Sequence, residues 1–143
     1  MFGLEEDVIV SAAYINPQSR DLFPVCAVQT HFTDLFEDTL GAFQVSPNVV
    51  LCGDFNAREV SDAHTGFVLD CPEVLETRRY VCNSVNKAGH LLVDLAAATS
   101  MAIATGRVVG DDGQPSFTGN YGDKKSRPDH VLLSGFVQTC VFV

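Results

Sequence analysis

The short apolar run NVVLCG, from Asn48 to Gly53, constrains the fold more than any other stretch of this sequence. A continuous apolar run of this kind is typical of a strand that is covered on both faces of a sheet. Upstream, residues Asp7–Ile15 are rich in β-branched side chains and predict another strand, which we interpret as a central one. Between the two, apolar residues recur every three or four positions over Pro24–Phe43, which predicts an amphipathic helix with proline in its first turn. A strand, a helix and a strand in this order indicate a layered α/β domain.

The second half of the chain continues the alternation of helical and extended segments. Its spacing predicts one helix, at 87–101, and strands at 102–109, 115–119, 127–134 and 136–143. The composition of residues 110–113, GDDG, predicts a turn. Residues 54–87 are polar and irregular, and their pattern supports no firm assignment.

Length and charge restrict the class of protein. At 143 residues the chain is about one domain long, and with 46% hydrophobic residues it can build a core. Its net charge of −9 argues against a protein that coats nucleic acid, because such affinity comes largely from Lys and Arg. The charge does not exclude an enzyme whose carboxylates hold a divalent cation, since the ion then supplies the positive charge.

Cysteine usage and hydropathy indicate where the chain resides. The five cysteines are odd in number and none are at C-x-x-C spacing, so neither a disulfide framework nor a zinc site is expected. No apolar run approaches the about 20 residues that span a bilayer, and the first seven residues carry three acids rather than a basic signal region. We therefore expect an intracellular protein, nuclear or cytoplasmic, in a reducing compartment and without a membrane partner.

The strongest local signal is LCGDFNA, in which Asp54 and Asn56 follow the apolar strand. In open α/β sheets ligands gather beyond the carboxyl ends of strands, and in an extended chain side chains two apart point the same way. An ionised Asp54 can orient or deprotonate a water and help to hold a hard cation, and Asn56 can donate to a phosphate oxygen. The alternative is an Asx-turn, in which both side chains only bond to backbone.

Four segments in order, VIVSAAYINP, VVLCGDFNA, PSFTG and RPDHVLLS, resemble the endonuclease/exonuclease/phosphatase superfamily. Within it, residues 85–134 are most similar to the endonuclease domains of LINE-type (non-LTR) retroelements, and the resemblance covers nearly the whole chain. It implies part of a four-layer α/β sandwich, with two β-sheets flanked by helices. The implied activity is Mg²⁺-dependent (or Mn²⁺-dependent) nicking of DNA by an activated water. A reverse transcriptase domain downstream in the same polyprotein is the implied further partner.

The resemblance also implies roles for individual residues. Asp54 resembles the aspartate that activates the attacking water, and Asn56 the asparagine that positions the phosphate; both are implied to touch the metal. Tyr14 resembles the tyrosine whose hydroxyl reaches the phosphate or leaving group, although it also suits a core position on a strand. Asp129 resembles the aspartate that holds a catalytic histidine in its working tautomer and orientation.

Two further residues are candidates for substrate contact, each with a simpler alternative. Asn16 stands where members of the superfamily often contact substrate, but it also suits a plain Asn-Pro turn. Arg20 is able to meet a phosphate in a bidentate manner, although a lone loop arginine is usually only solvated.

The chain departs from the superfamily in ways that lower the expected activity. The family's N-terminal strands, the second of which carries the metal-binding glutamate, and its closing Ser-Asp-His segment have no counterpart in residues 1–143. We therefore expect a single incomplete domain, poorly soluble and weakly active or inactive alone. Two alternatives stay open: an enzyme of the same superfamily that acts on lipid or sugar phosphates, and a non-catalytic relic or gene-model fragment.

The adjacent pair Asp129–His130 suggests a catalytic dyad, but its context favours another interpretation. PSFTG precedes the pair and VLLS follows it, which is the setting of the superfamily's earlier, buttressing aspartate. Since neighbouring residues of a strand face opposite sides of the sheet, we expect His130 to point away from Asp129.

Overall fold

A computed structural model of the chain describes residues 7–16, 25–58, 85–107, 110–111, 114–115, 117–118 and 125–135. Arg20 and the strand expected at 136–143 lie outside these residues. The described part consists of β1 (Val8–Tyr14), α1 (Val25–Val45), β2 (Asn48–Asp54), α2 (Lys87–Thr99), β3 (Ala102–Ile103), β4 (Phe117–Thr118), β5 (Lys125–Ser126) and β6 (Asp129–Leu133).

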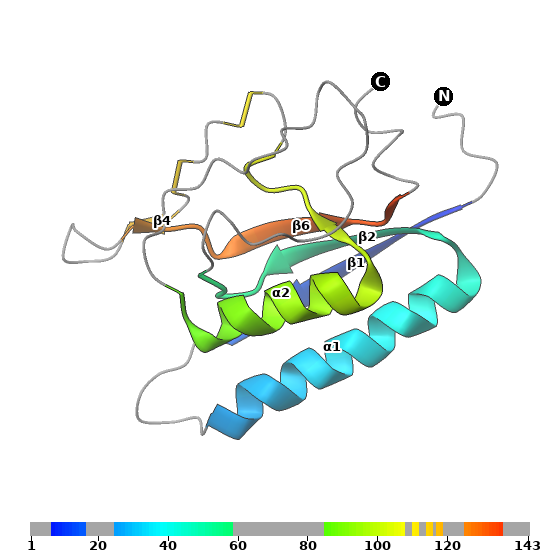
Figure 1. Cartoon of the computed structure of the whole chain (residues 1–143), viewed down its shortest axis with the longest axis horizontal. Helices are drawn as coiled ribbons and strands as arrows, with labels where there is room; N and C mark the ends of the chain where they lie inside the picture. The colour runs from blue at the N-terminus through cyan, green and yellow to red at the C-terminus, as the bar shows by residue number, and fades with distance from the viewer. Residues whose placement is uncertain are drawn as a thin grey trace.

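Four of these strands form one mixed sheet in the order β1-β2-β6-β3 (Figure 1). β1 and β2 are parallel and are joined through α1, whereas β6 runs antiparallel to both β2 and β3. β4 and β5 pair separately as a short antiparallel hairpin. The expected α/β class is therefore confirmed, with a single mixed sheet and one layer of helices in the described residues.

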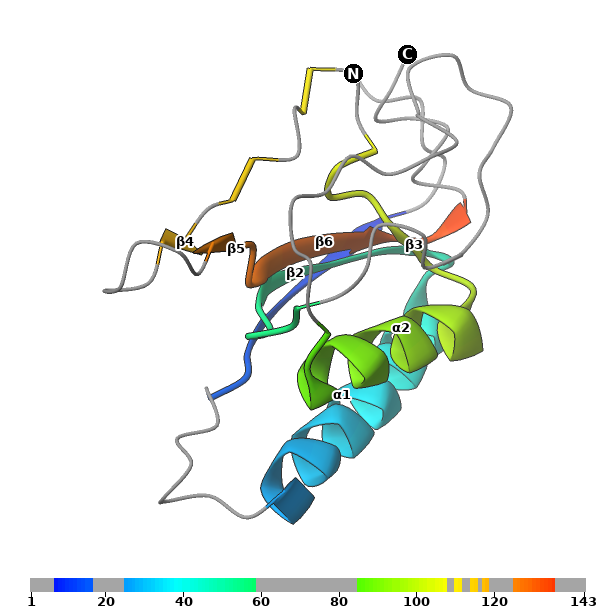
Figure 2. The same cartoon turned by 60° about the vertical axis from the view of Figure 1, so that its left-hand side comes forward.

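Both helices cover the same face of the sheet, as two views agree (Figures 1 and 2). The core lies between this face and the helices, because alternate residues of the strands point towards them. Its fully buried members are Leu51, Phe55, Ala57, Leu92, Ala96, Met101, Ile103 and Leu132. Ala13, Leu35, Phe36 and Leu91 pack against the cluster with part of their surface exposed.

Ser46 joins the end of α1 to the starts of two strands. Its backbone N–H donates to Ala42 O, which closes the last turn of the helix. Its hydroxyl donates to Asp7 O and accepts from the Asn48 N–H at 3.0 Å. These bonds fix the register in which β2 leaves the helix and lies beside β1.

The ends of α2 show why this helix is shorter than expected. Asn86 caps its N-terminus by accepting from Gly89 N–H, as asparagine commonly does. Ser100 takes the left-handed conformation and its N–H bonds back to Ala96 O and Ala97 O. The helix therefore ends at Thr99 rather than at residue 101, and Met101 turns into the core.

Two other expectations on the elements need correction. The strand expected at 102–109 stops early, because Gly106, with φ 77°, forms a turn and Thr105 Oγ1 accepts from Val131 N–H. β1, expected to be central, lies at the edge of the sheet that the described residues form, with Val10 66% exposed. Within the described residues, no helix combines the length and hydropathy needed to cross a membrane.

Candidate active site

Tyr14, Asp54 and Asp129 form a row across three adjacent strands. Tyr14 is the register partner of Asp54 in the parallel β1–β2 ladder, and Asp54 is the register partner of Asp129 in the antiparallel β2–β6 ladder. Register partners point to the same face of a sheet. On β2 the alternate residues Val49 and Leu51 belong to the core under the helices, so the row faces the opposite side. We call these three residues the carboxylate row.

The hydrogen bonds of the β2–β6 ladder show how closely the two acids approach. Phe55 N–H donates to Pro128 O at 3.0 Å, which places Asp54 and Asp129 between bonds, as a non-hydrogen-bonded pair. In such a pair the Cα atoms are about 4.5 Å apart and the side chains are closer than in the other type. Asp129 is exposed and Asp54 is partly exposed, so a ligand from solvent reaches both.

Gly53 allows β1 and β2 to meet directly beside the row. Its φ is 152°, and a Cβ placed on it would lie 1.9 Å from Ala13 O. Any larger residue would push the strands apart at the position before Asp54. The glycine of GDFN is therefore required by backbone approach, which sets the spacing between Tyr14 and Asp54.

The chain does not stay extended after Asp54, contrary to the expectation from its spacing. Asn56 has φ 46°, in the left-handed region that asparagine tolerates better than most residues. Its N–H donates to Asp54 Oδ1 at 2.9 Å, which forms the Asx-turn considered as an alternative. The Asn56 side chain leaves the row: Nδ2 donates to Ile15 O at 2.7 Å and fastens the turn to the end of β1.

His130 lies on the face opposite Asp129, as expected. It is 1% exposed, and its ring packs at a 46° tilt against Phe55, with centroids 6.3 Å apart. His130 Nε2 lies 3.1 Å from Ala57 O, and because a carbonyl only accepts, Nε2 carries the proton and donates. Asp129 and His130 are therefore not a side-chain pair, and His130 supports the 54–58 turn from within the core.

Asn86 also contacts this turn, and the sequence interpretation missed it. Its Nδ2 donates to Asn56 O at 2.8 Å, and its Oδ1 accepts from Arg58 N–H at 2.8 Å. The available signal was its type and place, since an asparagine directly before a predicted helix is a typical N-cap. Nothing in the spacing from Asn56 to Asn86 indicates the contact with the turn.

β1 and β2 end, and β6 and α2 begin, at the same end of the sheet (Figures 1 and 2), and Asn16 and Arg127 flank two of these strand ends. Asn16 is exposed, two residues beyond Tyr14. Arg127, just before β6, forms an ion pair with Asp111 at 2.8 Å, and the second carboxylate oxygen of Asp111 accepts from Gly106 N–H. The Arg127 guanidinium therefore helps to hold the turn after β3 through Asp111.

The row fits a hydrated divalent cation better than a fully protein-coordinated one. Among the described residues, no group of three or more His, Cys, Asp or Glu side chains is placed to hold a metal. Two neighbouring carboxylates are nevertheless a donor set that suits Mg²⁺, which keeps several waters and is commonly held by one or two carboxylates plus substrate phosphate. Asp54 and Asp129 are the residues able to contribute such ligands here.

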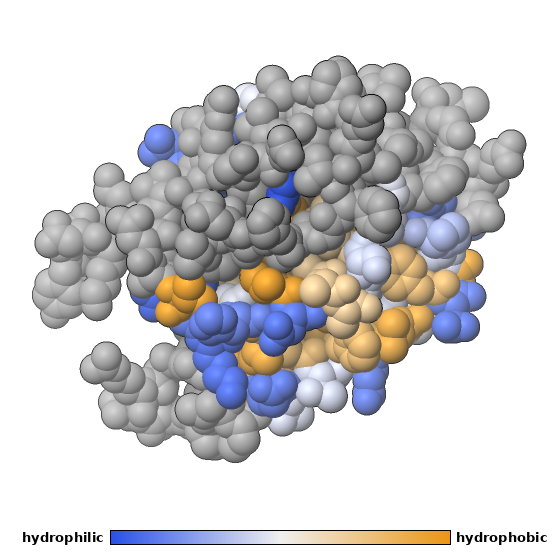
Figure 3. Space-filling model, in the orientation of Figure 1, coloured by the Kyte–Doolittle hydropathy of each residue, from blue (hydrophilic) through white to orange (hydrophobic). Residues whose placement is uncertain are grey.

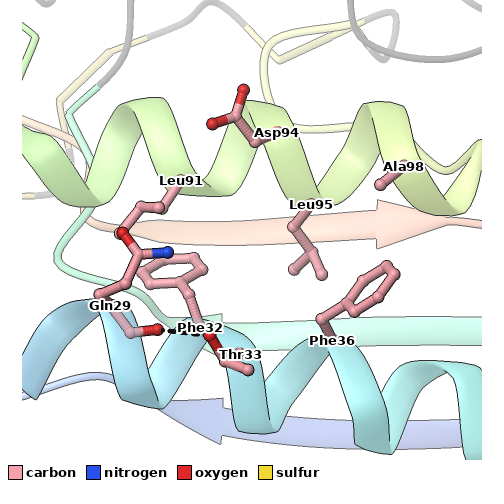
Figure 4. A pocket seen from close by; sticks show the side chains of 8 residues that line it. All are labelled: Gln29, Phe32, Thr33, Phe36, Leu91, Asp94, Leu95 and Ala98. Atoms are coloured by element: carbon pink, nitrogen blue, oxygen red, sulfur yellow. Dashed lines mark hydrogen bonds between the residues drawn. The ribbon is translucent and has the colours of Figure 1, made fainter.

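A shallow apolar hollow lies on the other side of the sheet, between α1 and α2 (Figure 4). It has a volume of about 220 Å³, and Phe32 and Leu95 form its floor, with Gln29 and Asp94 at its rim. In the space-filling view apolar residues gather over the two helices, interspersed with hydrophilic ones (Figure 3). The hollow contains no member of the carboxylate row and reflects the packing of the two helices.

No family model, curated protein or solved structure matches this chain.

Proposed function

We propose that this chain carries part of the active site of a metal-dependent phosphodiesterase of the endonuclease type, which nicks DNA with an activated water. The observation that supports the proposal is the carboxylate row, in which Asp54 and Asp129 stand side by side and Tyr14 follows on the same face. Two like charges directly opposite each other destabilise a sheet. If these two carboxylates held a divalent cation, the ion would offset their repulsion and would supply the positive charge that an acidic protein needs to hold a phosphate.

Each residue of the row has a chemical task in this proposal. The carboxylate of Asp54 accepts a hydrogen bond from a water and orients it for in-line attack on phosphorus. The Tyr14 hydroxyl, on a side chain that is 68% exposed, donates to a phosphate oxygen or to the leaving oxygen. Asp129 would help Asp54 to hold the cation, or would hold a histidine as the superfamily resemblance implies. Within the described residues no histidine lies on the face of the row.

The four-layer sandwich, the retroelement origin and the downstream reverse transcriptase belong to the same proposal, and they rest on the ordered motifs of the sequence. In the part of the chain that the structure describes, Asp54 and Asp129 are register partners, and no group of three or more His, Cys, Asp or Glu side chains could hold a metal. We therefore expect Mn²⁺ or Mg²⁺ to bind weakly and the isolated chain to nick DNA slowly or not at all.

Metal binding and cleavage with four proteins test the proposal: the wild type, Asp54→Asn, Asp129→Asn and the control Asp38→Asn, whose residue is exposed on α1. We expect Mn²⁺ binding, followed by its electron paramagnetic resonance signal, to weaken about 10-fold or more in the two row variants and not in the control. Equal binding by all four proteins would contradict the proposal. Supercoiled plasmid and a phosphoinositide panel, assayed in parallel, distinguish a nuclease from a lipid phosphatase.

A further inference from the structure

Asn86 makes more hydrogen bonds to the site turn than a helix cap requires. Its Oδ1 accepts from Gly89 N–H and from Arg58 N–H, both at 2.8 Å, and its Nδ2 donates to Asn56 O at 2.8 Å. Its own backbone N–H donates to Arg58 O at 3.1 Å. The residue thus pairs with the turn backbone through both main-chain and side-chain groups.

Asn86 both caps helix α2 and holds the backbone of Asn56, and only the second task needs its Nδ2 donor. Capping a helix needs only an acceptor, which serine, threonine and aspartate also provide. Holding Asn56 O needs a donor as well, and among short side chains only asparagine has a donor and an acceptor on one planar group. The Nδ2 bond is therefore independent of the cap and acts on the turn alone.

The peptide groups of Asn56 connect Asn86 to the carboxylate row. Asn56 O accepts from Asn86 Nδ2, and Asn56 N–H donates to Asp54 Oδ1 at 2.9 Å. Asn56 is in the left-handed conformation, with φ 46°, so its N–H and C=O directions are held by bonds on both sides. Asn56 therefore links the Asn86 side chain to the Asp54 carboxylate through one hydrogen bond on each side.

We propose that Asn86 is a positioning residue that sets the orientation of the Asp54 carboxylate by holding the Asn56 backbone. The inference deepens the proposed function, since it concerns the ligand geometry of the same site. It assigns to Asn86 the part that outer hydrogen-bond partners take at metal centres, where their removal lowers metal affinity without removing a ligand.

Asn86→Asp tests the inference because it separates the two tasks. The variant keeps an acceptor for Gly89 N–H and Arg58 N–H but loses the donor to Asn56 O and places a carboxylate oxygen against it. Asn86→Ser is the second variant: its hydroxyl can still cap the helix, but the amide group that bonds Asn56 O is removed. Ser134→Ala is the control: it removes the acceptor of Val49 N–H at 3.0 Å, at the opposite end of the β2–β6 ladder.

Amide hydrogen exchange without metal gives the first readout. In Asn86→Asp we expect faster exchange of Asn56 N–H by about 10-fold and a changed carboxylate ¹³C shift of Asp54, with α2 protection retained. Ser134→Ala should change neither signal. If Asn56 N–H and the Asp54 shift stay as in the wild type in both Asn86 variants, the inference is wrong, whether or not the protein binds metal.

Mn²⁺ affinity gives the second readout and separates this inference from the proposed function. We expect Asn86→Asp to weaken Mn²⁺ binding about 10-fold, towards the value of Asp54→Asn. If Asp54→Asn abolishes binding while Asn86→Asp binds as the wild type does, the positioning role is overturned and the site remains. If Asp54→Asn binds normally, the proposed function fails, and the exchange data alone then decide whether Asn86 holds the turn.

Discussion

Asp54 and Asp129 stand opposite each other in the β2–β6 ladder as a non-hydrogen-bonded pair, the arrangement that brings cross-strand side chains closest. Opposed acids lower the stability of a sheet unless a positive charge lies between them. The pair therefore offers two carboxylates to a cation, and the effect of each charge on stability and on metal binding is measurable.

Without metal, the Asp54→Asn variant should be more stable than the wild type. With metal, it should be less stable than the wild type. Asparagine keeps an acceptor for the Asn56 N–H and removes one of the two opposed charges. We expect the free energy of unfolding in EDTA to rise by about 0.2–1 kcal/mol, and the stabilisation by Mn²⁺ to disappear. Urea unfolding in EDTA measures the first quantity, and the same experiment with Mn²⁺ measures the stabilisation by the metal. A loss of stability in EDTA would show that the Asp54 charge has a stabilising partner instead.

Gly53→Ala should separate β1 from β2 and disrupt the row. The added Cβ would lie 1.9 Å from Ala13 O, a backbone atom that does not yield as a side chain does. We expect a loss of about 3 kcal/mol in the free energy of unfolding. Gly41→Ala is the matched control, because that glycine lies in α1 with open space around it, and alanine there should add about 0.5–1 kcal/mol. Similar effects at the two glycines would contradict the close approach.

At position 56, glycine should be tolerated better than alanine. Both variants lose the 2.7 Å bond from Asn56 Nδ2 to Ile15 O, but only alanine also opposes the left-handed conformation. We expect the free energy of unfolding of Asn56→Ala to be about 1–2 kcal/mol lower than that of Asn56→Gly. Asn56→Ala should therefore unfold at a lower denaturant concentration. Chemical denaturation of the two variants under the same conditions measures this difference in the free energy of unfolding. If alanine proves the more stable, the turn does not require φ above zero in solution.

His130→Gln should leave Mn²⁺ binding and any plasmid nicking unchanged, because glutamine retains a donor for Ala57 O in a buried site. His130→Ala should lower the free energy of unfolding by about 2–4 kcal/mol through the cavity and the lost bond. Thermal unfolding and metal titration of both variants measure these effects. A folded His130→Gln protein that has lost nicking would reinstate Asp129–His130 as a catalytic pair.

Periodicity in the sequence predicted the two helices and the strands β1, β2 and β6, because apolar spacing reports which side of an element is buried. It also placed Asp54 correctly at the end of a strand. The row of three residues was not derivable from spacing, since it depends on the register of β1 and β6 against β2. That register is set by distant contacts such as those of Ser46 and Ser134.

The turn after Asp54 shows where local spacing misleads. Two residues at alternate positions suggest a common face only if the backbone stays extended, and Asn56 leaves that conformation to bond Ile15 O. Asn86 was recognisable as a helix cap, but its bond to Asn56 O joins two segments whose separation carries no periodic signal. Non-local hydrogen bonds of this kind are the part of a site that pattern reasoning does not reach.

The alternation of Asp129 and His130 makes β6 intolerant of insertions and deletions. A slip of one residue against β2 would place an aspartate among Phe55 and Leu51 and a histidine beside Asp54, so core and surface would be exchanged together. Length changes in this region during evolution should therefore be confined to connections outside the strand. A related chain that altered β6 itself by one residue would have to alter its partner strand as well.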